Sequence, residues 1–311
     1  MANDTVQRAF LGIEIGGSKL QLVAGDETAA IVEHRRFDVD KNGGAEGIRR
    51  QIAAALPALA ARWKPAAVGV GFGGPVNWRN GRIARSHQIE GWSEFDLGGW
   101  LRELTGLPVA VENDSNAATF AEATRGAGAG CNPVFYFNLG SGVGGGLVVD
   151  GRIYHGQTPG EAEFGHLRLE RDGTTVEDRC SGWAVDRRLR AMASAATDSE
   201  LARLIGPAAG GEARHLRAAL DAKDTSARQV MTELAEDISF ALSHVTHLFH
   251  PEAVVMGGGL SMVGEPLRLA VATALSGRVM EVFHGGPEVK LAALGEDAVP
   301  IGALLLARSL A

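Results

Sequence analysis

The sequence has few cysteines, no run of basic residues and no long apolar stretch. Its two cysteines, Cys131 and Cys180, form no spaced pair, which excludes a disulfide framework and a cysteine-rich zinc site. The net charge of −7 and the scattered Lys and Arg disfavour a nucleic-acid surface, which would need cations clustered against phosphate. No apolar run reaches the ~18 residues that would span a membrane, and residues 1–8 lack the apolar core of a signal peptide. We therefore expect a cytoplasmic protein with no nucleic-acid or membrane partner.

Two common nucleotide-binding signatures are also missing. No GxxxxGK[ST] sequence of a Walker A loop occurs, and no GxGxxG leads from a strand into a helix as a Rossmann site requires. The stretch Gly142–Gly145 is superficially similar, but a strand follows it, which disfavours a dinucleotide-dependent oxidoreductase. Glycine itself is abundant, at 42 of 311 residues, about twice the usual ~7%. Because these glycines are clustered, they indicate sites rather than a flexible linker.

A pattern of apolar strand, glycine turn and second strand occurs twice. The first copy covers strands at 10–15 and 20–24, and the second has strands at 134–139 and 147–149 around a turn at 140–146. We interpret this as an internal duplication at the scale of a domain. The other elements follow from apolar runs and helical spacing. Strands are expected near 28–37, 68–72, 108–111 and 253–256, and helices near 47–63, 97–105, 186–195, 212–222 and 226–249, with another beginning near Ser115.

Glycine turns of this kind suit phosphate. Glycine lets backbone N–H groups approach phosphate oxygens and adopt positive φ, and a neighbouring hydroxyl adds one more donor. The segments Gly16-Gly17-Ser18 and Gly140-Ser141-Gly142 both fit, and Gly257-Gly258-Gly259 follows a later strand. A single glycine turn can simply tighten a hairpin, but its recurrence at three strand ends favours phosphate binding.

A carboxylate lies between the two turns in the sequence. The segment Glu112-Asn-Asp-Ser-Asn116 follows a buried strand and precedes a helix, and strand ends are where α/β folds meet ligands. Phosphoryl transfer to a hydroxyl group needs a carboxylate that accepts the hydroxyl proton, and Asp114 can take that role. Asn113 can hydrogen-bond a sugar as donor and as acceptor. The alternative is that these residues only cap the helix.

A second polar cluster, Glu163-Phe-Gly-His166, follows the loop from Gly156 to Gly160. A Glu and a His three residues apart on a helical turn share one face and can bracket vicinal sugar hydroxyls. Without other motifs they could equally be a surface pair.

Taken in order, six motifs resemble those of the ROK family, named for repressors, open reading frames and kinases. They are Glu14–Lys19, Gly73–Pro75, Glu112–Asn116, Leu139–Gly146, Glu163–His166 and Met256–Gly259, and the match runs from about residue 10 to residue 305. The resemblance implies an α/β, two-lobed actin/hexokinase (ribonuclease H-like) fold, with duplicated mixed-sheet domains and a cleft between them. The expected lobes are residues 1–117 plus 298–311, and residues 118–297.

The resemblance also implies a role for each matching residue. The first phosphate motif comprises Glu14, Gly16, Gly17, Ser18 and Lys19, and the second comprises Gly140, Ser141, Gly142 and Gly144. The adenosine motif is Gly257, Gly258 and Gly259. The sugar-contacting positions are Gly74, Asn113, Asp114, Glu163 and His166, with Asp114 as the catalytic base. Family members carry a further sugar-binding Glu before a Ser-Gly pair, and Glu177 matches that spacing.

The activity implied by this resemblance is ATP-dependent phosphorylation of a hexose, with glucose as the leading acceptor, glucose 6-phosphate as the product and Mg²⁺ as the accompanying ion. A kinase for fructose, mannose or an N-acetyl amino sugar is an alternative, and so is a sugar-sensing protein without catalysis. The repressor branch of the family carries an N-terminal helix-turn-helix. Because the first phosphate strand begins by residue 10, we expect the kinase branch. We also expect a homodimer or homotetramer.

Three departures from the family pattern stand out. The family's structural zinc site uses a His and three Cys after the Glu-x-Gly-His motif, whereas residues 167–176 form a short stretch without cysteine, so we predict no zinc. Glu14 replaces the usual Asp of the first phosphate motif, which keeps the carboxylate but lengthens the side chain by a methylene. A sugar-loop Asn common in the family is replaced by His87-Gln88, so the identity of the hexose stays open.

Overall fold

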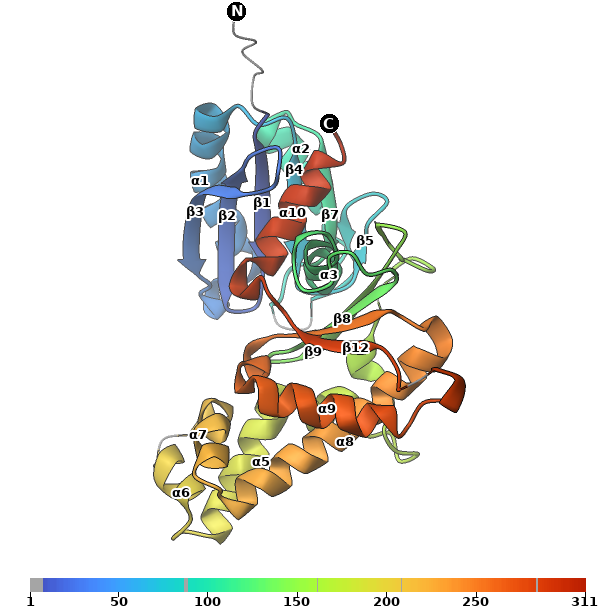
Figure 1. Ribbon diagram of the computed structural model, residues 1–311. Coiled ribbons are helices and arrows are strands. Elements are labelled where there is room, and N and C mark those ends of the chain that lie inside the picture. The colour runs from blue at the N-terminus through green and yellow to red at the C-terminus, as the bar shows by residue number, and fades with distance from the viewer. Residues whose placement is uncertain (1–7, 87–88, 161, 208, 284) are drawn as a thin grey trace, which may run out of the picture. The chain divides into compact units, whose positions relative to one another are not determined.

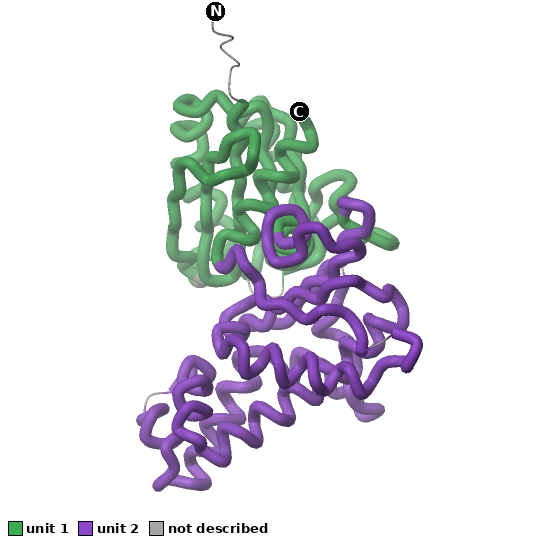
Figure 2. The backbone as a smooth tube through the Cα atoms, in the orientation of Figure 1, with its two compact units in different colours: residues 1–121, 153–161, 296–311 green, residues 122–152, 162–295 purple. Residues whose placement is uncertain are grey.

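The computed structural model describes residues 8–86, 89–160, 162–207, 209–283 and 285–311. The chain divides into two compact units (Figure 2). Unit 1 comprises residues 1–121, 153–161 and 296–311, and unit 2 comprises residues 122–152 and 162–295. The segment 153–161 therefore differs from the sequence-based division, which placed it in the C-terminal lobe. The physical reason is local, because the imidazole of His155 bonds to Glu112 in unit 1.

Unit 1 is built on a five-stranded mixed sheet with the strand order β3-β2-β1-β4-β7 (Figure 1). Its strands are β1 (Phe10–Ile15), β2 (Lys19–Gly25), β3 (Ile31–Asp38), β4 (Val68–Phe72) and β7 (Val109–Asn113), and a small sheet of β5 (Val76–Asn77) and β6 (Arg82–Ile83) follows β4. Strand β1 is antiparallel to β2 and parallel to β4, which is parallel to β7. The carboxyl ends of β1, β4 and β7 therefore lie along one edge of the sheet, where α/β folds bind ligands.

The two faces of this sheet differ in side-chain size because strand residues alternate between them. One face packs into a core with α1 (Gly44–Trp63) and α2 (Leu97–Thr105). From β1 and β4 it takes Leu11, Ile13, Ile15, Val68, Val70 and Phe72. On β1 and β4 the intervening residues are Glu14 and three glycines, and a Cβ on any of these glycines would meet α10 (Ala298–Arg308), which crosses the other face (Figure 1). These glycines are Gly12, Gly69 and Gly71.

Unit 2 repeats this arrangement in a second five-stranded sheet, with the order β10-β9-β8-β11-β12. Its strands are β8 (Val134–Leu139), β9 (Val143–Val149), β10 (Arg152–Ile153), β11 (Ala253–Gly257) and β12 (Glu288–Leu291). Strand β8 is antiparallel to β9 and parallel to β11, just as β1 is to β2 and β4. The equal strand order confirms the internal duplication that the repeated strand-turn-strand pattern predicts.

The remaining elements are helices and short 3₁₀ turns. The helices are α3 (Asp114–Arg125), which follows β7, and in unit 2 α4 (Val176–Cys180), α5 (Gly182–Ala195), α6 (Glu200–Ile205), α7 (Leu216–Asp221), α8 (Thr225–Phe249) and α9 (Glu265–Ser276). The 3₁₀ turns are η1 (Lys41–Gly43), η2 (Phe164–His166), η3 (Glu212–His215), η4 (Gly259–Val263), η5 (Glu281–Phe283) and η6 (Gly295–Asp297). The helix predicted over 212–222 is thus split into η3 and α7. Among the described residues, no helix combines the length and apolar character needed to cross a membrane.

The second glycine turn is shorter than the sequence predicts. The expected turn covers residues 140–146, but β9 already begins at Val143. The glycines at 144, 145 and 146 pair with residues 138, 137 and 136 across the hairpin. At Gly145 the reason for glycine is packing, since a Cβ there would lie 2.9 Å from Cβ of Phe164. A glycine run in this position therefore marks a crowded strand rather than a longer turn.

The glycine face of the unit 1 sheet gives a test of packing. Gly69→Ala places a methyl group against the carbonyl oxygen of Ala303, so we expect the urea midpoint to fall by an amount equivalent to about 1–3 kcal/mol. The matched control is Gly47→Ala on α1, where a Cβ meets nothing within 4 Å. Because alanine favours helix over glycine, the control should gain up to about 1 kcal/mol. Equal midpoints for Gly69→Ala and the wild type would contradict the close contact between β4 and α10.

Candidate nucleotide and sugar sites

The first glycine turn connects β1 to β2 and presents two consecutive backbone amides. The Gly16 N–H donates to the carbonyl oxygen of Lys19 at 3.0 Å, which closes the turn. Within the described part of the chain, the amides of Gly17 and Ser18 donate to no protein atom. Ser18 is exposed and Gly17 half-buried. Neighbouring amides of this kind form a nest that attracts an anion.

The second glycine turn, between β8 and β9, also presents two consecutive backbone amides. The Gly140 N–H donates to the carbonyl oxygen of Gly142 at 2.9 Å. The amides of Ser141 and Gly142 have no acceptor in the described ranges, so they repeat the arrangement of the first turn. Gly144, predicted to belong to this phosphate motif, differs. It lies in β9, and its amide donates to Oδ1 of Asn138 at 2.9 Å.

Glu14 of the first phosphate motif is held inside its own hairpin. It lies on β1 directly opposite Gln21 of β2 and is buried. Its Oε1 is 3.2 Å from Nζ of Lys19, and its Oε2 accepts a hydrogen bond from Nε2 of Gln21. Burial raises the pKa of Glu14 above its ordinary value of 4.5, although Lys19 and the two hydrogen bonds oppose that rise. Both carboxylate oxygens therefore have partners within the protein.

The turn after β7 carries the predicted base. Oδ1 of Asn113 accepts hydrogen bonds from the amides of Ser115 and Asn116 at 2.8 and 3.1 Å, so Asn113 caps α3. Its Nδ2 donates to the carbonyl oxygen of Gly74 at 3.2 Å, which ties the predicted sugar loop to this turn. Asp114 is the first residue of α3 and is half-buried. Asn113 therefore caps α3, and Oδ1 of Asp114 also accepts a hydrogen bond from the Ser115 amide at 2.7 Å.

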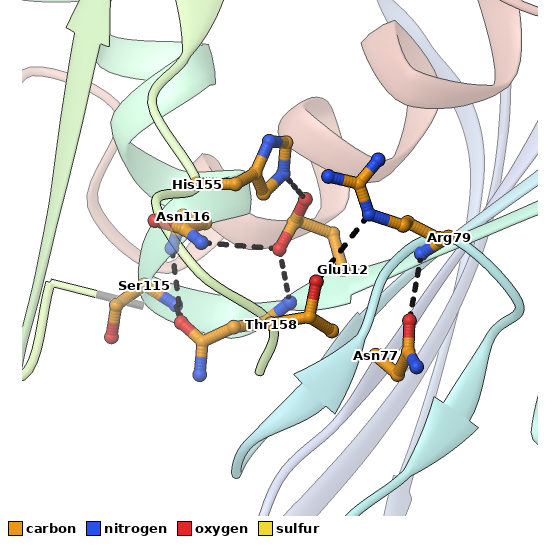
Figure 3. A network of polar contacts seen from close by, with 8 residues as sticks. Asn77, Arg79, Glu112, Ser115, Asn116, His155 and Thr158 are labelled. Carbon is orange, nitrogen blue, oxygen red and sulfur yellow. Dashed lines mark hydrogen bonds and ion pairs between the residues drawn. The ribbon is translucent and has the colours of Figure 1, made fainter. Parts of the chain in front are cut away.

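Next to this turn lies a polar contact that the sequence does not reveal. Glu112, on β7, is only 2% exposed, and its Oε2 is 2.5 Å from Nε2 of His155 (Figure 3). The imidazole ring also stacks on Trp78, with ring centroids 4.1 Å apart and planes 17° apart. A lone histidine in a loop has no spacing or motif that distinguishes it, and its partner is distant in the sequence. Only the fold brings His155 to the β7–α3 turn.

In unit 2, the cluster from Glu163 to His166 forms the 3₁₀ turn η2. Oε2 of Glu163 and Nδ1 of His166 are 3.4 Å apart, and the two side chains are 45% and 65% exposed. Between them Phe164 is buried, with its ring centroid 5.6 Å from that of Phe135 and 5.1 Å from that of Phe137. The aromatic contacts fix the turn on β8 and leave both polar groups accessible to a ligand.

Residues 167–176, where the family's zinc ligands would be expected, form a tight hairpin. Its ends pair in a β-bridge. Thr175 then caps α4 in a capping box with Asp178, in which each side chain bonds the other residue's backbone. Glu177, in the first turn of α4, accepts a hydrogen bond from the Val143 amide at 2.7 Å. A hairpin and a helix cap therefore hold Glu177 beside the second glycine turn.

A pocket of about 440 Å³ opens beside the same turn in unit 2. Its size lies within the range of roughly 300–1,000 Å³ that is typical of small-molecule sites. The lining residues that matter here are Gly140, Ser141, Trp183, Arg214 and Gly259. The pocket thus brings together the second phosphate motif and the predicted adenosine motif.

The three glycines at the end of β11, Gly257 to Gly259, have different surroundings. A Cβ on Gly257 would strike the ring of Tyr136, and one on Gly258 would overlap the backbone of Leu139. These two glycines are therefore required by the close approach of neighbouring strands, and Gly258 has a φ of 82°. Of the three, Gly259 alone lines the pocket, and a Cβ there would meet nothing within 4 Å.

The predicted site residues fall into two groups. Unit 1 contains Glu14, Gly16, Gly17, Ser18, Lys19, Gly74, Asn113 and Asp114. Unit 2 contains Gly140, Ser141, Gly142, Gly144, Glu163, His166, Glu177, Gly257, Gly258 and Gly259. The replacement His87-Gln88 lies outside the described residues. Among the residues that the structure does describe, no group of three or more His, Cys, Asp or Glu could hold a metal ion, and the absence of zinc stays a prediction.

The model of the ROK family matches residues 10–309. The chain belongs to the ROK family. It is 31% identical to a glucokinase of Streptomyces coelicolor, with 96% of this chain and 97% of that protein covered, and 29% identical to a glucokinase of Halalkalibacterium halodurans, with 95% and 93% covered. The crystal structure of a ROK family glucokinase from Streptomyces griseus in complex with glucose and AMPPNP is similar with a TM-score of 0.83, at 30% identity and with 97% and 99% of the two chains covered. The actin/hexokinase-like α/β fold expected from the sequence is confirmed.

The burial of Glu14 predicts a pH-dependent stability. Its folded-state pKa is raised, so the stabilisation from the neutral carboxyl is complete below the unfolded value of 4.5 and is lost as pH rises through the folded-state pKa. Glu14→Gln removes this titration. The melting temperature of Glu14→Gln, relative to the wild type, should therefore increase between pH 4 and pH 8. If the melting temperatures of the variant and the wild type differ by the same amount at every pH in that range, the pKa of Glu14 is not raised.

Proposed function

We propose that this chain transfers the γ-phosphoryl group of ATP to a hydroxyl group of glucose and forms glucose 6-phosphate. Its family and its glucokinase relatives make the chain a sugar kinase. The acceptor, the base and the residues that hold each substrate are our proposal. The observation that carries it is the position of Asp114, which directly follows β7 and whose Oδ2 would lie 3.4 Å from a Cβ on Gly73, beside the turn of Gly74.

Asp114 has the surroundings that a general base needs. It lies in the first turn of α3, where the helix dipole favours the anionic carboxylate. A Cβ on Gly73 would lie 3.4 Å from Oδ2 of Asp114, so the carboxylate lies beside the end of β4. We assign to Asp114 the acceptance of the proton from the acceptor hydroxyl. Asn113 and Gly74 hold the turn through their mutual hydrogen bond.

The proposed sugar ligands of unit 2 offer both donors and acceptors. Glu163 and His166 are exposed and 3.4 Å apart, a spacing that suits two neighbouring hydroxyl groups. Oε2 of Glu177 accepts the Val143 amide, so we assign its contact with sugar to Oε1. In this proposal Glu177 connects the sugar site to the second glycine turn.

The nucleotide site fits the second turn and the pocket beside it. The Ser141 and Gly142 amides bind phosphate oxygens, and Gly259, Trp183 and Arg214 line the space for adenosine. In kinases ATP supplies the phosphoryl group while Mg²⁺ neutralises its developing charge. Such Mg²⁺ sites use one or two carboxylates together with substrate phosphates rather than a full protein cage. We therefore propose that Mg²⁺ is held chiefly through the nucleotide.

Acceptor identity is tested with a coupled ADP-release assay over glucose, fructose, mannose and N-acetyl amino sugars. We expect the highest kcat/KM for glucose. A higher value for another hexose would reassign the acceptor while keeping the enzyme class. Sugar binding without turnover on any of these sugars would overturn the kinase proposal and support a sugar-sensing protein.

Asp114→Asn tests the base. The amide cannot accept the hydroxyl proton, so we expect kcat to fall by about 10²–10⁴-fold. Glucose affinity, measured by calorimetry, should stay within about tenfold because the side chain keeps its size and polarity. Asp96→Asn is a matched control, since Asp96 caps α2 in the same unit and asparagine caps equally well. Full activity in Asp114→Asn would remove Asp114 as the base.

A further inference from the structure

The segment 153–160 is anchored to unit 1 although the chain on both sides of it belongs to unit 2 (Figure 2). Its main contact is the bond from His155 to Glu112, supported by the stack on Trp78. A second contact joins Nε of Arg79 to Oγ1 of Thr158 at 3.4 Å (Figure 3). The His155 contact is the shorter of the two polar contacts and reaches a buried group, so it carries more of the anchoring.

Glu112 needs these partners because its carboxylate is buried. Oε1 accepts hydrogen bonds from the Asn113 amide at 2.9 Å and from Nδ2 of Asn116 at 3.1 Å. Oε2 has His155 as its partner among the described residues. A buried carboxylate that loses a partner keeps its desolvation cost without compensation. Removing the imidazole would therefore favour movement of Glu112 toward water.

Movement of Glu112 would disturb the residues on both sides of Asp114. Glu112 accepts hydrogen bonds from Asn113 and from Asn116. The Asn116 amide also donates to the Asn113 side chain, so the three residues are joined to one another. The backbone of Asp114 thus lies within a closed set of hydrogen bonds. We propose that His155 is a positioning residue, which fixes the orientation of Asp114 through Glu112. This inference rests on the proposed role of Asp114 as the base.

The stack on Trp78 orients the imidazole toward Glu112. Trp78 follows the sugar loop of Gly74, and the guanidinium of Arg79 lies 4.5 Å from its ring centroid. The Trp78 ring is thus in contact with His155 and with Arg79, which limits the rotation of both. A planar ring without a hydrogen-bonding nitrogen at position 155 would keep this stack. Such a variant therefore separates the contribution of the stack from that of the bond to Glu112.

His155→Phe keeps a ring for the stack and removes the bond to Glu112. We expect kcat to fall by about 10–100-fold because small misplacements of a catalytic group are costly, while KM for ATP stays within about twofold. His155→Gln places an amide nitrogen near the position of Nε2 and should recover most of the activity, whereas His155→Asn is too short and should not. The comparison of His155→Gln with His155→Asn shows whether activity needs the bond to Glu112, even if His155→Phe does not fold. Thr158→Val, which removes only the contact with Arg79, serves as the control with unchanged kcat.

A double-variant cycle separates positioning from general damage to the fold. If His155 acts through Asp114, then His155→Phe should not lower the residual rate of Asp114→Asn any further. If the double variant instead loses kcat by the product of the two single-variant factors, the proposal is overturned. A wild-type kcat in His155→Phe would overturn it as well.

Amide hydrogen exchange supplies a readout that does not depend on turnover. In His155→Phe and His155→Asn, exchange over residues 112–119 should be faster than in the wild type and in Thr158→Val. Unchanged exchange there would refute the positioning role even if the wild type phosphorylates no sugar. A wild type without turnover, but with faster exchange in the variants, would refute the kinase function and the catalytic part of this inference, and would leave His155 as a structural anchor.

Discussion

A carboxylate buried in a protein must keep its hydrogen-bond partners, and in this chain Glu112 imposes that requirement at the end of β7. Its partners come from the following turn and from a loop that is distant in the sequence. The bonds that satisfy Glu112 therefore also determine where the first turn of α3 begins. They join residues 153–160 to unit 1 through His155, and they join Asn113, which caps α3, to Glu112. The residues around Asp114 are joined to this one buried side chain.

Glycine contributes to the structure in three separate ways. At Gly17 and Gly142 it belongs to turns whose amides are available to an anion. At Gly69 it lets a helix lie directly on a sheet, and at Gly258 it lets neighbouring strands approach closely. The sequence shows all of these simply as glycine, and the surrounding residues decide the role. This is why Gly144, predicted as part of a phosphate turn, is found paired within a strand.

In unit 2 a short hairpin and a helix cap hold Glu177, one of the predicted sugar ligands. The cap formed by Thr175 and Asp178 begins α4, and the core contacts of Val176 and Cys180 bury the inner side of that helix. Glu177 is then directed to the Val143 amide. The hydrogen bonds that Thr175 gives to Asp178 keep the pKa of that carboxyl below its ordinary value, so the capping group stays ionised to a lower pH than an ordinary aspartate. Local backbone bonding is sufficient to position this carboxylate.

The sequence alone predicts the repeated strand-turn-strand pattern, the family and the exact bounds of three strands, because these depend on residues that are close together in the chain. Phe10–Ile15, Val68–Phe72 and Val134–Leu139 occur with the bounds that their apolar runs predict. Which polar atoms have partners within the protein follows from the fold instead. Glu14 is engaged by Lys19 and Gln21, and Glu112 by His155, which is 43 residues away. The physical reason is that a hydrogen bond depends on distance in space, and the fold alone sets that distance for residues far apart in sequence.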